Sequence, residues 1–104
     1  MVIYEVNLAI DADIYPEFQL WLKTHAKEML QFPGFINASI LKPENEEVSG
    51  QEKLTVQYQL ESRGALDVYF TEFAPKMRGD GIALFKDRFS AERRIFEVQE
   101  YILK

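Results

Sequence analysis

The succession of local patterns in the sequence predicts one α+β domain whose elements run strand, helix, strand, strand, helix, strand. Apolar side chains recur at every second residue in four segments and with helical spacing in the segments between them. Apolar residues make up 47% of the 104 residues, and eight Phe, five Tyr and one Trp supply packing area for a single core. Two right-handed βαβ units in this order place both helices on one face of a four-stranded antiparallel sheet, which is the ferredoxin-like arrangement.

The first strand and the first helix are predicted from a change of period near Asp11. Residues 2–10 alternate with period two, which is typical of a strand. The helix is expected to begin at Ile14, after a turn, and Pro33-Gly34 ends it. One arc of about 100° on this helix carries an apolar stripe. The stripe consists of Ile14, Phe18, Trp21, Leu22, His25 and Met29.

Two further alternating segments, residues 35–41 and residues 53–61, predict the strands of a hairpin joined by an acidic loop. The outer face of the sheet, away from the helices, is expected to be mostly polar with a few apolar side chains. The sequence assigns to it Ile3, Glu5, Asn7, Ala9, Phe35, Asn37, Ser39, Leu41, Thr55, Gln57 and Gln59. Such a face is either solvated, as in many antiparallel sheets, or covered by a second copy of the chain.

The last part of the chain predicts a broken helix and a final strand. Ser62 is expected to cap the helix, and Pro75 to break it and start a second helical segment that reaches Phe89. Because Gly79 and Gly81 weaken this second segment, a bent or two-piece helix is expected. Residues 93–103 are rich in β-branched and aromatic side chains and predict the last strand.

Composition excludes several classes of function. The chain has no cysteine and one histidine, so thiol chemistry is absent and a multi-histidine metal site is not expected. A net charge of −5 argues against nonspecific nucleic-acid binding. The N-terminus lacks a basic targeting segment and no apolar run approaches the roughly 20 residues that span a bilayer, so a cytoplasmic protein without a membrane partner is expected. Neither a glycine-rich phosphate loop nor a dinucleotide fingerprint is present, and no cofactor is expected.

Four short motifs occur together: Val-Ile-Tyr-Glu-Val-Asn-Leu at the start, then Trp-Leu-x-x-His, Met-Leu-x-x-Pro-Gly-Phe and Arg-Phe-x-Ala-x-Arg-Arg. In this combination the chain resembles a family of short bacterial proteins of unknown function within the dimeric α+β barrel superfamily, which also contains the antibiotic-biosynthesis-type monooxygenases. The resemblance implies the fold and a homodimer but no established activity. Haem-degrading members of the superfamily carry an axial histidine on the second helix, where this chain has Tyr69 and Phe70, so haem is not expected.

His25 is the candidate catalytic residue because it lies near the centre of the apolar stripe, one turn from Trp21 and Met29. There it could line a pocket between helix and sheet and exchange a proton near neutral pH. The alternative is a histidine at the edge of the core, hydrogen-bonded to a backbone group or a carboxylate.

Candidate ligand contacts come from aromatic and basic side chains. Trp21, Tyr58 and Tyr69 could wall the same pocket, although aromatic residues at these spacings also suit a filled core. Segment 76–94 carries six basic and three acidic residues, from which Arg78 and Arg88 are the candidates for contact with an anionic ligand. The alternative is a solvated surface with local ion pairs.

Two functions from different classes remain open. The first is a small-molecule-binding dimeric α+β barrel that takes a small anionic or aromatic ligand and acts as a cofactor-independent oxygenase or isomerase. The second is a non-catalytic interaction or regulatory module that acts as a homodimer through the open face of the sheet. A cavity at His25 would favour the first, and a filled core would favour the second.

Overall fold

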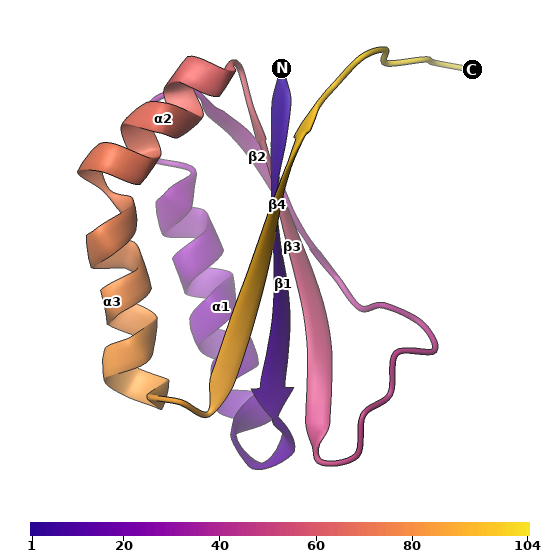
Figure 1. Cartoon of the computed structure of the whole chain (residues 1–104), viewed down its shortest axis with the longest axis vertical. Helices are drawn as coiled ribbons and strands as arrows, with labels where there is room; N and C mark the ends of the chain where they lie inside the picture. Colours follow the sequence, from indigo (N-terminus) through magenta and orange to yellow (C-terminus); the bar gives the residue numbers. More distant parts are fainter.

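The computed structural model describes residues 1–104 and contains the predicted succession of elements around one four-stranded antiparallel sheet. The strand order is β2-β3-β1-β4, and every neighbouring pair is antiparallel. All helices cover one face of the sheet (Figure 1). The elements are β1 (Val2–Asp11), η1 (Ala12–Ile14), α1 (Tyr15–Met29), β2 (Phe35–Leu41), β3 (Gln51–Leu60), α2 (Arg63–Glu72), α3 (Ala74–Phe85) and β4 (Phe89–Glu97).

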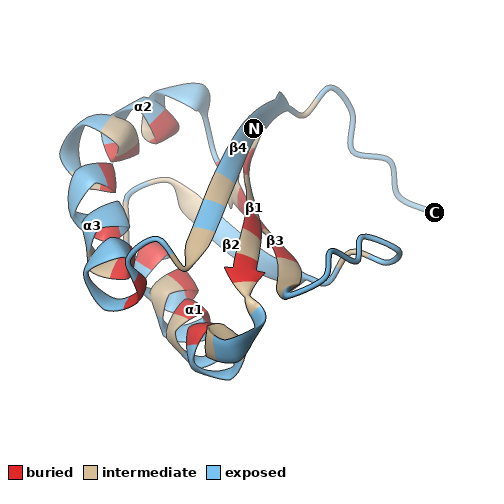
Figure 2. Cartoon of the chain, turned by 60° about the horizontal axis from the view of Figure 1, so that its bottom comes forward, coloured by how far each residue is buried: buried red, intermediate tan, exposed pale blue.

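The core lies between the sheet and the helices, where the buried positions of all layers face one another (Figure 2). Seventeen buried apolar residues form one cluster, in which alternate residues of β1 and β3 meet the apolar stripe of α1. Phe18 of α1 and Leu66 of α2 are completely buried. None of the helices combines the length and the apolar character needed to cross a bilayer.

The turn between α1 and β2 depends on Gly34. Its φ of +84° lies in the left-handed region that favours glycine, and a Cβ at this position would come within 2.4 Å of the Ala65 Cβ on α2. Any side chain here would therefore strain the backbone and push α2 away from the turn. The predicted helix stop at Pro33-Gly34 is confirmed four residues after the last residue of α1.

Phe35 lies on the inner face of the sheet and not, as the alternation of residues 35–41 predicted, on the outer face. Its ring is in edge contact with Tyr58 and with Tyr69, at centroid distances of 5.8 Å and 5.4 Å. The cause is a register shift between Phe35 and Asn37, which pair with the consecutive residues Leu60 and Gln59. An extra residue in one strand reverses the facing of every side chain on one side of it.

The expected break of the second helix is confirmed, and it falls where Pro75 predicted it. Ser62 caps α2 by accepting a hydrogen bond from the Ala65 N–H at 3.1 Å. α2 ends at Glu72, and α3 starts at Ala74 with Pro75 in its first turn. Gly79 and Gly81 lie inside α3 and do not interrupt it.

The last strand is displaced from its prediction by four residues at its start and six at its end. Phe89 begins β4 and is not helical, and the strand ends at Glu97. β4 pairs with residues 2–10 of β1, from Phe89↔Ile10 to Glu97↔Val2. One further backbone hydrogen bond joins the Val98 N–H to the Met1 carbonyl at 3.0 Å, and residues 98–104 have no regular secondary structure.

Two segments project from the side of the sheet opposite the helices: the loop of residues 42–50 and the C-terminal tail of residues 98–104 (Figure 1). The tail carries three exposed apolar residues before Lys104, namely Tyr101, Ile102 and Leu103. Both segments flank the outer face of the sheet.

Candidate functional site

A cavity of about 870 Å³ lies between the inner face of the sheet and helices α1 and α3. It has 22 lining residues, of which 15 are hydrophobic. The sheet side is formed by Tyr4, Val6, Leu8, Val56, Tyr58, Phe89, Ala91 and Arg93, and the helix side includes Phe18, Trp21, His25, Tyr69, Met77, Arg78 and Ile82. Volume and apolar lining are in the range of small-molecule sites.

Val6 shows that the cavity reaches the centre of the sheet. It lies on the inner face of the central strand, paired with Val56 on β3 and Arg93 on β4, yet it is only partly buried. Its inner-face neighbours Tyr4 and Leu8 on β1 are buried. An apolar residue at such a position is left partly accessible only where the helices above it do not fill the space.

Gly81 sets the distance between α1 and α3 at one end of the cavity. A Cβ on Gly81 would lie 2.9 Å from Trp21 Cη2 and 3.4 Å from Phe89 Cζ, so only glycine lets the indole pack this closely on α3. Phe18 completes this end, with its ring centroid 5.4 Å from that of Trp21 and 5.0 Å from those of Phe85 and Phe89.

His25 lines the cavity one turn after Trp21 and stacks on it, with ring centroids 4.5 Å apart and an angle of 22° between the planes. It makes no hydrogen bond to another residue, and neither ring nitrogen is an unpartnered buried atom, so both remain open to the cavity or to solvent. Burial lowers the pKa of His25, and the charges of Glu28 and Asp80 oppose this effect only in part. The imidazole is therefore neutral at pH 7, with one nitrogen free to accept a proton.

Three tyrosines meet at another part of the cavity wall. The ring centroid of Tyr4 lies 6.0 Å from those of Tyr58 and Tyr69, and the Tyr4 hydroxyl accepts a hydrogen bond from Arg78 Nη2 at 3.3 Å. Burial raises the pKa of Tyr58 far above its ordinary value and, with the neighbouring Tyr4, raises the pKa of Tyr69 to about 12. The hydroxyls of Tyr58 and Tyr69 have no protein partner but are not sealed from the cavity. They are neutral donors available to a ligand.

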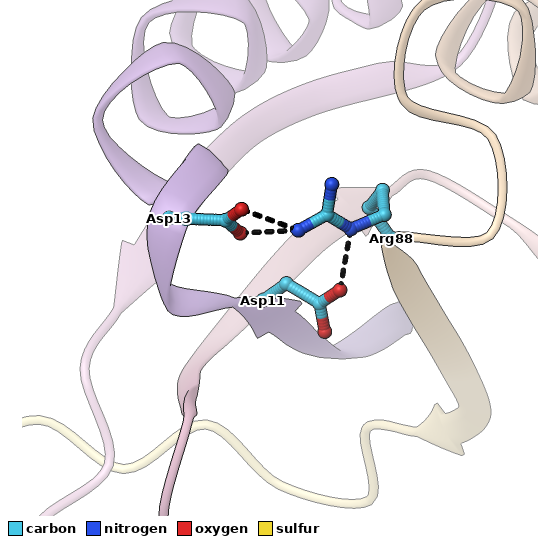
Figure 3. A network of polar contacts seen from close by, with 3 residues as sticks. All are labelled: Asp11, Asp13 and Arg88. Atoms are coloured by element: carbon cyan, nitrogen blue, oxygen red, sulfur yellow. Dashed lines mark hydrogen bonds and ion pairs between the residues drawn. The ribbon is translucent and has the colours of Figure 1, made fainter.

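Five of the six residues predicted from the sequence line this one cavity: Trp21, His25, Tyr58, Tyr69 and Arg78. Arg88 does not. Its Nε donates to Asp11 Oδ2 at 2.7 Å, and its Nη2 contacts both carboxylate oxygens of Asp13 (Figure 3). The hydrogen bond from Arg88 lowers the pKa of Asp13, and the two carboxylates raise that of Arg88. Arg88 thus ties the start of β4 to the end of β1 and is already neutralised.

Arg93 lines the cavity but was not among the residues chosen from the sequence. It pairs with Val6 on the inner face, whereas its neighbour Arg94 faces outward and binds Glu5. The available signal was the alternation that starts at Phe89. A strand beginning there places Phe89, Ala91 and Arg93 on one face, and the predicted start at residue 93 concealed it.

Fold and cavity together define a ferredoxin-like α+β protein with a pocket between its helices and its sheet. The chain belongs to the family described as a domain of unknown function, DUF4286, whose model matches residues 1–99. No curated protein matches the sequence at a significant level.

Solved structures with the same fold include proteins of known and provisional assignment. A Deinococcus radiodurans protein provisionally assigned as an antibiotic biosynthesis monooxygenase has a TM-score of 0.76 and 15% identity, with 100% of this chain and 98% of that chain covered. SnoaB, a cofactor-independent oxygenase from Streptomyces nogalater, has a TM-score of 0.72 and 14% identity, with 99% and 98% covered. MhuD, a heme-degrading protein from Mycobacterium tuberculosis with two hemes in its active site, has a TM-score of 0.60 and 22% identity, with 96% and 98% covered. At these identities the likeness shows a shared fold.

Proposed function

We propose that the cavity binds a small organic molecule and that the protein is a cofactor-independent oxygenase or isomerase in which His25 moves a proton. The observation that carries the proposal is a cavity of about 870 Å³ with mainly apolar walls and one neutral imidazole that has no protein partner. The alternative, a histidine hydrogen-bonded to a backbone group or a carboxylate at the edge of the core, is less favoured because His25 makes no hydrogen bond to another residue.

The chemistry available to these residues is proton abstraction from an aromatic or enolisable substrate. Neutral His25 would take the proton as a general base, and the apolar walls formed by Trp21, Tyr58 and Tyr69 would exclude water from the resulting carbanion. Arg78 or the phenol hydroxyls would stabilise the negative oxygen that develops. Return of the proton to another carbon gives an isomerase, and reaction of the carbanion with dioxygen as co-substrate gives an oxygenase. The oxygenase reading is supported by the fold shared with SnoaB.

Haem is not part of this proposal because the donor set does not suit it. The chain has one histidine, and at the second helix the cavity offers Tyr69, a buried phenol whose pKa is raised to about 12. A neutral phenol is a poor iron ligand compared with a phenolate. Titration with hemin should therefore give no absorption band that depends on His25. A band that His25→Phe removes would overturn cofactor independence.

The test of function compares the protein with two variants at His25. Aromatic and enolisable compounds are screened by thermal shift, and positive compounds are then assayed for oxygen consumption and for exchange of the acidic proton with deuterium. His25→Phe fills the stripe but cannot accept a proton, so it should keep the fold and lose turnover. His25→Gln keeps a hydrogen-bonding group without the base and should keep binding with loss of turnover. If no compound raises the melting temperature of the protein, the non-catalytic module is the better reading.

We also propose that a second copy of the chain covers the outer face of the sheet. Its polar centre is already satisfied internally: Glu5 is buried and accepts hydrogen bonds from Asn7, Gln57 and Arg94. Burial of this polar centre against a partner would therefore leave none of these groups without a hydrogen-bond partner. Phe96 lies opposite Ile3 on the same face and is 39% exposed, which supplies an apolar border. The loop of residues 42–50 and the C-terminal tail flank this face and would contact the partner chain (Figure 1).

Sedimentation equilibrium at micromolar concentration tests this assembly. The unmodified chain should sediment as a dimer, and Phe96→Glu should produce monomers because it introduces a charge into the apolar border. Leu20→Glu is the matched control, since Leu20 is 71% exposed on the side of α1 away from the sheet, and this variant should remain dimeric. A monomeric unmodified chain would overturn the assembly.

A further inference from the structure

We infer that the ligand of the cavity is an amphipathic organic anion, an apolar body bearing a carboxylate or a similar oxyanion, whose negative end is held between Arg78 and Arg93. The inference rests on the proposed function in one respect only, namely that this cavity is the ligand site. It adds the chemical class of the ligand and the second arginine.

The carrying observation is how the basic residues of segment 76–94 are partnered. Three of the six have a carboxylate: Lys76 binds Asp80 at 3.2 Å, Arg88 binds Asp11 at 2.7 Å and Arg94 binds Glu5 at 2.7 Å. The other three, Arg78, Lys86 and Arg93, have no carboxylate partner. These three line the cavity, and the three paired residues do not.

The restriction of the unpaired basic residues to the cavity is notable because the chain has more carboxylates than basic groups. The chain has 17 acidic and 12 basic residues, so an unpaired cation is not explained by a shortage of anions. The cavity lining contains three basic residues and one acidic residue, Asp87, which is the chain neighbour of Lys86. A positive concavity in an acidic protein attracts and retains an anion.

The two arginines approach the tyrosine cluster from different walls. Arg78 extends from α3, donates to the Tyr4 hydroxyl at 3.3 Å and lies 5.8 Å from the centroid of the Phe70 ring. Arg93 extends from β4 on the inner face, where it pairs with Val6, two residues from Tyr4. Both guanidinium groups act on the Tyr69 phenol, since the charges of Arg78 and Arg93 each lower its pKa against the larger effect of burial. Both arginines therefore line the cavity that Tyr69 also lines, one from α3 and one from β4.

The polar groups in that region are almost all donors. The guanidinium groups only donate, and the neutral hydroxyls of Tyr58 and Tyr69 have no protein acceptor. A ligand group that only accepts, and that carries negative charge, satisfies all of them together. The rest of the lining is apolar, with Phe18, Trp21 and Met77 among the walls, and suits an aromatic or alkyl body.

The experiment uses ligand pairs with the same body and different charge: benzoate with benzamide, trans-cinnamate with trans-cinnamamide, and decanoate with decanamide. Trp21 is the only tryptophan and lines the cavity, so the NMR signal of its indole N–H reports binding at this place. At least one acid should shift this signal with a dissociation constant at least tenfold lower than that of its amide. The preference should weaken as salt is added.

Variants locate the anion. Arg78→Gln with Arg93→Gln in one chain should weaken binding of the acid at least tenfold and leave binding of the amide unchanged. Lys76→Gln is the matched control, because Lys76 lies half a turn from Arg78 on α3 but is paired with Asp80 outside the cavity, and it should change neither affinity. Circular dichroism establishes that each variant is folded.

The possible failures are distinct. Equal binding of acids and amides would overturn the anion inference and leave the cavity as the ligand site. Tighter binding of the acids that survives the double substitution would overturn the assignment to Arg78 and Arg93. If no acid or amide moves the Trp21 signal at millimolar concentration, both the inference and the proposed ligand site are overturned.

Discussion

The two faces of the sheet both carry polar side chains among apolar ones, but they differ in whether these polar groups have hydrogen-bond partners within the protein. On the outer face Glu5 accepts hydrogen bonds at 2.7–2.9 Å from Arg94, Asn7 and Gln57, and Thr55 donates to Asn7 at 2.7 Å. On the inner face the hydroxyl of Tyr58 has no protein partner, and the same holds for the Tyr69 hydroxyl of α2 and the His25 imidazole of α1, which line the cavity above this face.

This difference in hydrogen bonding suggests that the polar groups of the two faces have different roles. A polar network that closes on itself stabilises the strand pairing across β3, β1 and β4 and can be covered without cost. Polar groups that point into an apolar cavity and remain unpaired contribute nothing to the fold. The proposed ligand would complete them, as in other sites where binding uses a few convergent polar groups.

The largest expected effect concerns the packed end of the core, where Phe18 of α1 meets Phe85 and Phe89. Phe18→Ala should lower the free energy of unfolding by ~3–5 kcal/mol, because Phe18 is fully buried among Trp21, Phe85 and Phe89 and its loss leaves a void. Phe70→Ala should cost less, since Phe70 is only partly buried. Urea melts measure both. A loss below ~1 kcal/mol for Phe18 would mean that this end is as open as the cavity.

The next effect tests the closed network of the outer face. Glu5→Ala removes the acceptor that Asn7, Gln57 and Arg94 share and should cost ~1–3 kcal/mol. Burial opposes ionisation of Glu5, but the three hydrogen bonds outweigh it and hold its pKa below the ordinary value. Its contribution is therefore present above the unfolded-state pKa and lost as pH falls through the folded-state pKa. The unmodified chain should show this acid-side loss in urea melts, and Glu5→Ala should show less of it.

A smaller effect separates two glycines of the same helix. Gly79→Ala should raise stability by ~0.5–1 kcal/mol, because nothing lies within 4 Å of the added Cβ and alanine is the better helix former. Gly81→Ala should lower stability by about 1 kcal/mol, because its Cβ meets Trp21 at 2.9 Å and displaces the indole toward the cavity. Thermal melts and Trp fluorescence measure the pair. Equal stabilisation by both substitutions would contradict the close approach of α1 and α3.

The smallest effect is the titration of His25. Because burial lowers its pKa, the NMR midpoint of His25 should lie below the ordinary value of about 6.5 in the folded chain and near it in urea. The unfolded chain then takes up a proton that the folded chain resists. The free energy of unfolding should therefore decrease as pH falls below the unfolded-state pKa of His25, and His25 should have no effect on it above that pKa. A folded-state midpoint above that of the unfolded chain would point to a carboxylate partner and against a free imidazole.

The spacing of apolar residues and the positions of capping and helix-breaking residues were sufficient to predict the fold, because these signals depend only on interactions between residues close in sequence. Alternation over residues 2–10, the cap at Ser62 and the break at Pro75 each follow from neighbours within a few residues, and each is found in the structure. The face of Phe35 and the start of β4 were wrong for a single reason. A register shift and a strand end are decided by the partner strand, which is distant in sequence.

Four of the six candidate site residues, Trp21, His25, Tyr58 and Tyr69, also came from local patterns, since a side chain on the apolar face of a helix or strand must point between the layers; Arg78 was chosen for its charge. Whether that space is filled was decided only by the tertiary structure, because it depends on how closely Gly81 lets α3 approach Trp21 and on what then remains above Val6. The excess of basic over acidic residues in segment 76–94 was also evident from the sequence. Their division into neutralised Arg88 and free Arg93 depends on carboxylates more than seventy residues away, such as Asp11, which only the folded chain brings into contact.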